Sequence, residues 1–290
     1  MSPEVDRPRT LRRIVTPGVC AIALLGSLAL ILARCTPTPS AAELLRRVNG
    51  AYDALRPIPR QVDMTFHTKV AVPGQPPTVT RGQAKILQVQ RKARFETLPG
   101  TMKFEAASPE GPKLTDAGEL VWVHDGRVLR TRYTLQNPSP GGPPIVQETY
   151  IDHDRVPEEL GSRYTDPMAE PELATEIVAH PFTLTRENWN GKSMYVLRSQ
   201  GEIVISDTTR MQMNLWVDPD DLLVRRTESD TTYVEPGTGT PRSTWMEAEL
   251  VYHLNVPLTD SDFELKLGPD AKDMTEALLQ EGRSKAQAKP

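Results

Sequence analysis

The feature that most constrains the fold is an alternation of apolar and polar residues with a period of two. In the segment 62–72, for example, Val62, Met64 and Phe66 alternate with polar side chains. This period turns one face of a strand toward a core and the other toward water. Turns rich in proline and glycine interrupt this period-two pattern. The pattern predicts further strands at 79–89, 93–98, 102–107, 119–124, 127–135, 145–151, 182–187, 193–199, 202–207, 211–217, 223–229, 231–235 and 246–255.

The order of these segments excludes a parallel sheet, because no regular alternation of strands and helices occurs. A long antiparallel sheet must curl to close its edges. We therefore predict a mainly β (α+β) domain, a curved antiparallel sheet that forms a half-open barrel covered by a few helices. Phe263, Leu265 and Leu267 predict a last edge of this sheet.

One helix is predicted over residues 40–56. Its apolar stripe repeats at the helical spacing and consists of Leu44, Leu45, Val48, Ala51, Tyr52 and Leu55. Ser40 and Glu43 form a capping box at its start, and Pro57 and Pro59 end it. Shorter helices are predicted near 171–178 and from Met274.

The N-terminus predicts a membrane-targeting helix. Four arginines in residues 7–13 precede an uncharged run of fifteen residues, Val19–Ala33, which is typical of an export signal. Positive charge before the run predicts that the rest of the chain is exported. Segment 1–40 is thus a signal peptide or anchor, 41–273 one domain, and 274–290 a short helix and a frayed tail.

The fate of this segment has three readings. Leu32-Ala33-Arg34-Cys35 resembles a lipobox, which would make Cys35 a lipidation site. Ser40-Ala41-Ala42 offers an ordinary cleavage site, and the run could also stay uncut as an anchor. All three place the domain on the periplasmic or cell-envelope side, with the membrane reached through the N-terminal segment.

The composition argues against a nucleic-acid-binding function and against any site that needs a cysteine in the domain. Residues 41–290 carry 29 basic and 36 acidic side chains, net −7, which argues against nucleic acid as a partner. The chain's two cysteines, Cys20 and Cys35, both precede the domain, which therefore has neither a disulfide nor a thiolate metal site.

A search for catalytic and metal motifs finds none, so no catalytic residue, no metal and no cofactor is predicted. Asp152-His153-Asp154 could ligate a metal, but a solvated turn is the preferred reading because no partner motif appears. The aspartates of Asp218-Pro219-Asp220-Asp221 are read as the turn of a hairpin, since Pro and Asp both favour tight turns.

Four segments together resemble the LolA/LolB-like superfamily of bacterial envelope lipoprotein carriers. Asp116–Asp125 resembles the family's D-G-K-x-x-W strand, and Arg91–Phe95 resembles its R-P-x-x-F element. LWVDPDDLLVRR, residues 215–226, resembles a hairpin of lipoprotein-sorting relatives, and residues 256–272 resemble their closing signature.

The resemblance implies a half-barrel in which helices cover an apolar cavity for acyl chains. It assigns Arg91 to holding this cover closed, a role that Arg94 could take instead, and Phe95 to the cavity. Aromatic residues on predicted strands are further cavity candidates, although about half belong to an ordinary core. The full set of cavity candidates is Phe66, Phe95, Phe104, Trp122, Tyr133 and Trp216.

Three functions remain open at this point. The first is a non-enzymatic carrier or receptor for lipids or lipoproteins, whose partners are acyl chains. The second is an envelope sensor of the same fold that binds a membrane-bound regulator protein. The third, an envelope hydrolase, lacks a nucleophile and base in the sequence.

Overall fold

The computed structural model describes residues 39–106, 113–135, 142–156, 177, 179–206, 208–234, 239–277 and 279–280. It divides the chain into two units, Met1–Pro39 and Ser40–Pro290, and only the second is treated below. The predicted export signal and Cys35 lie outside the described residues. Within the described residues, no helix is long and apolar enough to cross a membrane.

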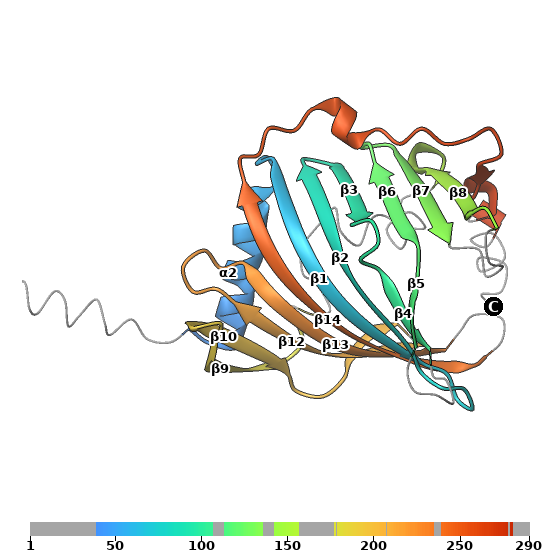
Figure 1. Cartoon of the computed structure of the whole chain (residues 1–290). Helices are drawn as coiled ribbons and strands as arrows, with labels where there is room; N and C mark the ends of the chain where they lie inside the picture. The colour runs from blue at the N-terminus through green and yellow to red at the C-terminus, as the bar shows by residue number, and fades with distance from the viewer. Residues whose placement is uncertain are drawn as a thin grey trace, which may run out of the picture. The chain divides into compact units, whose positions relative to one another are not determined.

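The described part of the second unit is built on one sheet of fifteen strands (Figure 1). Its main order is β15-β8-β7-β6-β3-β2-β1-β14-β13-β12-β10-β9, while β4 pairs with β2 and β5, and β11 pairs with β12. The strands are β1 (Arg60–Ala71), β2 (Thr78–Val89), β3 (Lys92–Thr97), β4 (Lys103–Ala106), β5 (Lys113–Asp116), β6 (Glu119–His124), β7 (Val128–Leu135), β8 (Ile145–Asp152), β9 (Phe182–Trp189), β10 (Lys192–Ser199), β11 (Ile203–Ser206), β12 (Thr209–Val217), β13 (Val224–Val234), β14 (Pro241–Leu254) and β15 (Lys272–Asp273).

All pairings are antiparallel except the short one between β15 and β8. The predicted mainly β class is therefore confirmed. The long strands β1, β2 and β14 bend along their length in Figure 1. Closure of the sheet into a half-open barrel stays a prediction.

Helix α2 (Ala41–Leu55) confirms the predicted helix at the start of the domain. The Ser40 side chain accepts a hydrogen bond from the Glu43 amide and so caps the first turn. The face turned to the sheet buries Leu44, Leu45, Val48, Tyr52 and Leu55.

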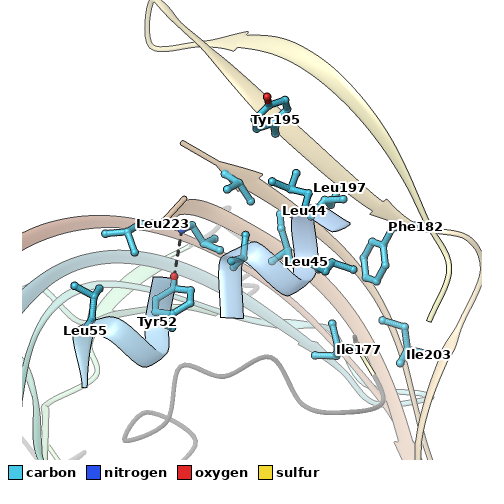
Figure 2. Close-up of a cluster of buried hydrophobic side chains, with 14 residues drawn as sticks. Leu44, Leu45, Tyr52, Leu55, Ile177, Phe182, Tyr195, Leu197, Ile203 and Leu223 are labelled. Carbon is cyan, nitrogen blue, oxygen red and sulfur yellow. Dashed lines mark hydrogen bonds between the residues drawn. The ribbon is translucent and has the colours of Figure 1, made fainter. Parts of the chain in front are cut away.

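This face of α2 is the centre of the largest buried cluster, which Figure 2 shows. The helix packs there against side chains from β9, β10, β11, β12 and the start of β13. Leu197 and Val217 are fully buried in the cluster. At about 25 cal/mol per Å² of buried apolar area, such packing holds the helix far more strongly than its intrinsic propensity could.

Most strand predictions are confirmed, with three corrections. Residues 223–229 and 231–235 form one continuous strand, β13, because the pairing with β14 runs without a break. The strand β5 was missed, since four residues are too few to show a period. β14 begins at Pro241, five residues before the predicted start.

The predicted last edge is wrong as a strand. Residues 260–263 form a short 3-10 helix, η2 (Asp260–Phe263), and the residues after it carry no strand pairing until β15. The segment 255–274, here called the C-terminal strap, instead buries Phe263 and Leu265 against Leu87 and Val123. Of the predicted helix near 171–178, only Ile177 falls within the described residues, and it is helical.

Candidate functional site

The sheet has two chemically different faces, which the strand register separates. We call the face that contacts α2 the inner face and the opposite one the outer face. Val62, Met64 and Phe66 of β1 lie on the inner face, because they join one apolar cluster with Tyr252, which also touches the α2 cluster. Asp63, Thr65 and His67 therefore point to the outer face.

The inner face carries an apolar surface beyond the part covered by α2. Its buried members are Val62, Met64, Ala84, Ile86, Phe95 and Ala248. Around them lie the half-buried side chains Phe66, Leu120, Trp122, Met246, Leu250 and Tyr252. We call these twelve residues the inner apolar surface; half of them keep part of their apolar area accessible.

Two local contacts shape this surface. The Phe95 and Trp122 rings stack nearly in parallel, with centroids 6.0 Å apart. Gly82 lies under the Phe66 ring, since a Cβ at this glycine would lie 2.7 Å from Phe66 Cζ. A larger residue at position 82 would therefore force the Phe66 ring or the strand to shift.

Five of the six predicted cavity aromatics lie on the inner face. Phe66, Phe95 and Trp122 are part of the inner apolar surface. The register places Phe104 there through its pairing with Thr80, and Tyr133 through its pairing with Leu120. Their role in ligand binding stays a prediction.

Trp216 lies on the outer face. It packs with Trp189, Met194 and Val196 in a separate cluster, and the Arg226 guanidinium lies 4.7 Å above its ring. Its neighbours Leu215 and Val217 take the inner face. Trp216 is therefore not part of the inner apolar surface.

Neither of the arginines considered from the sequence contacts α2 among the described residues. Arg91 lies exposed in the turn between β2 and β3, and its carbonyl oxygen is 2.9 Å from His124 Nδ1. Arg94 reaches the C-terminal strap and donates to the Glu264 carbonyl oxygen at 3.2 Å. The role of holding the cover stays a prediction for Arg91.

A third arginine, Arg60, contacts α2 and was missed. Its guanidinium donates to the Leu55 carbonyl oxygen at 2.7 Å and to Gln88 Oε1 at 3.1 Å. The side chain is only 2% exposed. A cation at the last carbonyl groups of a helix is favourable, because it meets the negative end of the helix dipole.

Two tyrosines complete this connection between helix and sheet. The hydroxyl groups of Tyr52, on α2, and Tyr252, on β14, are 2.8 Å apart. The Tyr52 hydroxyl also accepts a hydrogen bond from the Val224 amide at 3.2 Å (Figure 2). Burial raises the pKa of Tyr52, and it raises the pKa of Tyr252 well above its ordinary value. Burial also lowers the pKa of Arg60.

The aspartates of the β12–β13 hairpin have structural partners. Asp218 is 5% exposed, and its carboxylate lies 2.6 Å from Lys192 Nζ and 3.3 Å from Arg225 Nη2. It also accepts a hydrogen bond from the Asp220 amide. Burial raises the pKa of Asp218, but the Lys192 hydrogen bond and the other partners outweigh it, so the pKa is lowered. The carboxylate thus fixes the hairpin, as predicted.

The Asp152-His153-Asp154 segment is a 3-10 turn, η1 (His153–Arg155), at the end of β8. No group of three or more histidine, cysteine, aspartate or glutamate side chains in the described part of the chain could hold a metal ion. The reading as a solvated turn needs a correction, because both ring nitrogens of His153 are shielded from solvent.

Two hollows are also present among the described residues, and one of them reaches the inner apolar surface at Phe66. One of about 670 Å³ is lined largely by outer-face residues of β1, β2 and β14, among them His67, Arg81 and Glu247. Another of about 590 Å³ lies at the strand ends and includes Arg210 and Arg242. Within the described part of the chain, His67 is the one histidine that lines either hollow, and neither lining contains a nucleophile-base pair.

No family model matches the sequence, and no curated protein matches it. Solved structures are similar to the chain at low identity. A LolA superfamily protein from Nitrosomonas europaea is 17% identical over 79% of this chain and 99% of its own, with a TM-score of 0.26. An outer membrane lipoprotein-sorting protein domain from Vibrio parahaemolyticus is 13% identical over 77% and 95%, with a TM-score of 0.28.

The third similar structure is the MucA/MucB complex of Pseudomonas aeruginosa. The identity is 13%, the match covers 78% of this chain and 61% of that one, and the TM-score is 0.32. Among these three structures, the Nitrosomonas europaea protein carries the family name that the sequence resemblance suggested. At these TM-scores the matches support no inference about ligands or partners.

Proposed function

We propose that this protein is a non-enzymatic carrier or receptor of the cell envelope that binds acyl chains of lipids or lipoproteins on its inner apolar surface. The export signal read from the sequence would place the domain on the periplasmic side. The resemblance of four sequence segments to envelope lipoprotein carriers supports the same class of function.

The observation that carries the proposal is the inner apolar surface itself. Half of its members are only half-buried, although they adjoin a dry core. Phe66, Trp122 and Leu250 come from three different strands and keep apolar area accessible on one face. A contiguous apolar area of this kind marks a binding surface more often than chance exposure does.

Acyl-chain binding needs only apolar area. Burying one methylene group is worth about 0.8 kcal/mol, so a long chain gains on the order of 10 kcal/mol before the costs of ordering it. No nucleophile, metal or fixed charge is needed for this reversible reaction. The inner apolar surface supplies aromatic and aliphatic side chains and no carboxylate.

Native mass spectrometry of the protein isolated from its envelope fraction, with lipid extraction of the same sample, tests the proposal. We expect co-purified lipid or acylated peptide and binding of a fluorescent fatty acid. The idea fails if the isolated protein carries no lipid and the fatty acid does not bind.

A matched pair of variants on one strand locates the site. Leu250→Arg places a charge on the inner apolar surface, whereas Val251→Arg places the same charge on the neighbouring outer position, where Val251 is 56% exposed. We expect the first variant to lose fatty-acid binding by at least about tenfold, and the second to keep it. Equal effects of the two variants would place the ligand elsewhere.

A further inference from the structure

Two histidines meet edge to face where strands β6 and β8 end. His124 is the last residue of β6, and His153 begins the turn η1 that follows β8. Their ring centroids are 5.0 Å apart and the ring planes are at 87°. His124 is 8% exposed, so the pair is packed inside the corner formed by β6, β7 and β8.

Three of the four ring nitrogens of this pair lack hydrogen-bond partners within the described structure. His124 Nδ1 lies 2.9 Å from the Arg91 carbonyl oxygen and therefore carries the proton, which leaves Nε2 as the acceptor. Within the described structure, that Nε2 and both ring nitrogens of His153 are shielded from solvent and unpaired. Two neutral imidazoles tolerate such packing, whereas an imidazolium would bury a charge with an unpaired N–H.

The carboxylates near the pair are already engaged. Asp152 and Asp154 flank His153, and both form ion pairs with Arg127 of the β6–β7 turn, at 3.3 and 2.9 Å. Asp125, next to His124, pairs with Arg130 at 2.5 Å. Because cations hold all three carboxylates, a new positive charge on the rings meets little free negative charge.

The balance of these effects favours the neutral ring. Burial and the neighbouring His124 lower the pKa of His153, while Asp152 and Asp154 act in the opposite direction. The net direction is downward. Protonation of His153 is therefore costlier in the folded protein than in the unfolded chain.

The same corner holds the end of the C-terminal strap and Thr275, which follows it. The Asp152 amide donates to Thr275 Oγ1 at 3.0 Å, and the Met274 amide donates to the Tyr150 carbonyl oxygen at 2.9 Å. Arg155 of η1 pairs with Asp273 at 3.0 Å, where β15 lies beside β8. A shift of η1 would therefore disturb the anchoring of the strap.

We propose that His124 and His153 form an acid-sensitive latch, which ties η1, strand β8 and the end of the C-terminal strap to the sheet and opens when the His153 imidazole is protonated. The latch needs no ligand and does not depend on the proposed function. The pH dependence follows from the lowered pKa of His153. The neutral His153 ring stabilises the latch fully above the ordinary histidine pKa of about 6.5, and this stabilisation is lost as the pH falls below that value.

Amide hydrogen exchange of the full-length protein, corrected for intrinsic rates, tests the latch at about pH 7.5 and about pH 5.5. Peptides covering 145–156 and 268–277 should lose up to about tenfold of their protection at the lower pH, relative to peptides from β1 and β14. His153→Phe keeps an aromatic ring and removes the titrating group, so it should abolish this difference.

His253→Phe is the matched control, because His253 is exposed and pairs with Asp63 on the outer face. It should leave the acid-induced loss in place. The proposal is overturned if the corner peptides change no more than β1 and β14, or if His153→Phe loses protection as the wild type does.

A second measurement on the wild type keeps the proposal testable if His153→Phe does not fold. In an NMR titration of the imidazole groups, His153 should protonate below the ordinary range, together with a shift of the Thr275 amide. A normal His153 titration without any response of Thr275 would refute the latch.

Discussion

The hydrogen bonds of Tyr52 predict that Tyr52→Phe and Tyr252→Phe reduce the stability of the protein by different amounts. The Tyr52 hydroxyl has two partners, the Val224 amide at 3.2 Å and the Tyr252 hydroxyl at 2.8 Å. Tyr252 has its hydrogen bond to Tyr52 alone among the described residues. Removing one hydroxyl therefore differs physically from removing the other, although both changes are Tyr to Phe.

The expected magnitudes follow from the groups left behind. Tyr52→Phe leaves two buried groups without partners, each at a cost of about 1–3 kcal/mol, so the loss should be about 2–6 kcal/mol. Tyr252→Phe leaves the Tyr52 hydroxyl with the Val224 amide still donating to it. That loss should be only about 1 kcal/mol, the net value of one hydrogen bond.

Urea unfolding at equilibrium measures both losses as shifts in the midpoint at constant slope. The double variant should cost less than the sum of the single variants, by about 0.5–3 kcal/mol, because it leaves no orphaned Tyr252 hydroxyl. Tyr133→Phe serves as a control, since its hydroxyl makes a long hydrogen bond of 3.5 Å to the Ala117 carbonyl oxygen.

The reasoning is refuted if Tyr252→Phe destabilises the protein as much as Tyr52→Phe, or if the two losses add without coupling. The first result would show that the Val224 amide contributes nothing to the contact. The second would show that the 2.8 Å hydroxyl pair carries no energy of its own.

Three further predictions concern stability. Asp218→Asn should cost about 1–3 kcal/mol in urea unfolding at neutral pH, and the difference should shrink below about pH 4, because the lowered pKa makes the carboxylate's contribution disappear in acid. Gly82→Ala should reduce the free energy of unfolding by about 1–3 kcal/mol and so lower the melting temperature, since the new Cβ would press on the Phe66 ring. An unchanged melting temperature would contradict that contact. Because the pKa values of Tyr52 and Tyr252 are raised, the two tyrosines stabilise the fold fully below about pH 10 and lose this effect as the pH rises further. The free energy of unfolding of the double Tyr→Phe variant should therefore fall less steeply in alkali, as measured by unfolding curves at a series of pH values.

Local periodicity predicted the parts of the fold that depend on one strand or one helix at a time. The stripe of Leu44, Val48 and Tyr52 predicted which side of α2 would be buried. The alternation at 215–217 also indicated the face of Trp216: Leu215 and Val217 were assigned to the buried face, so the residue between them belongs to the opposite one. Trp216 was chosen as an aromatic residue on a predicted strand, against that alternation, and the structure places it on the outer face.

The features that sequence reasoning missed depend on contacts between distant segments. Arg60 opens a strand as an ordinary charged residue, and only the packing of α2 beside it buries the guanidinium. The apolar residues of the C-terminal strap alternate as a strand would, yet Phe263 and Leu265 pack across the sheet against Leu87 and Val123 and do not pair with a strand. His124 and His153 are 29 positions apart, and no local signal connects them.

Tyr252 connects the fold to the proposed function. It belongs to the inner apolar surface and also touches the cluster under α2, so it marks the border between that surface and the part of the face that α2 covers. Tyr52 and Arg60 attach the helix at this border through hydrogen bonds, whereas the rest of α2 is held by apolar packing. Hydrogen bonds depend on direction and apolar contacts do not, so these polar contacts determine where the cover ends. If the proposed function holds, we therefore expect the attachment of α2 to set the area available to an acyl chain as much as the aromatic side chains on the strands do.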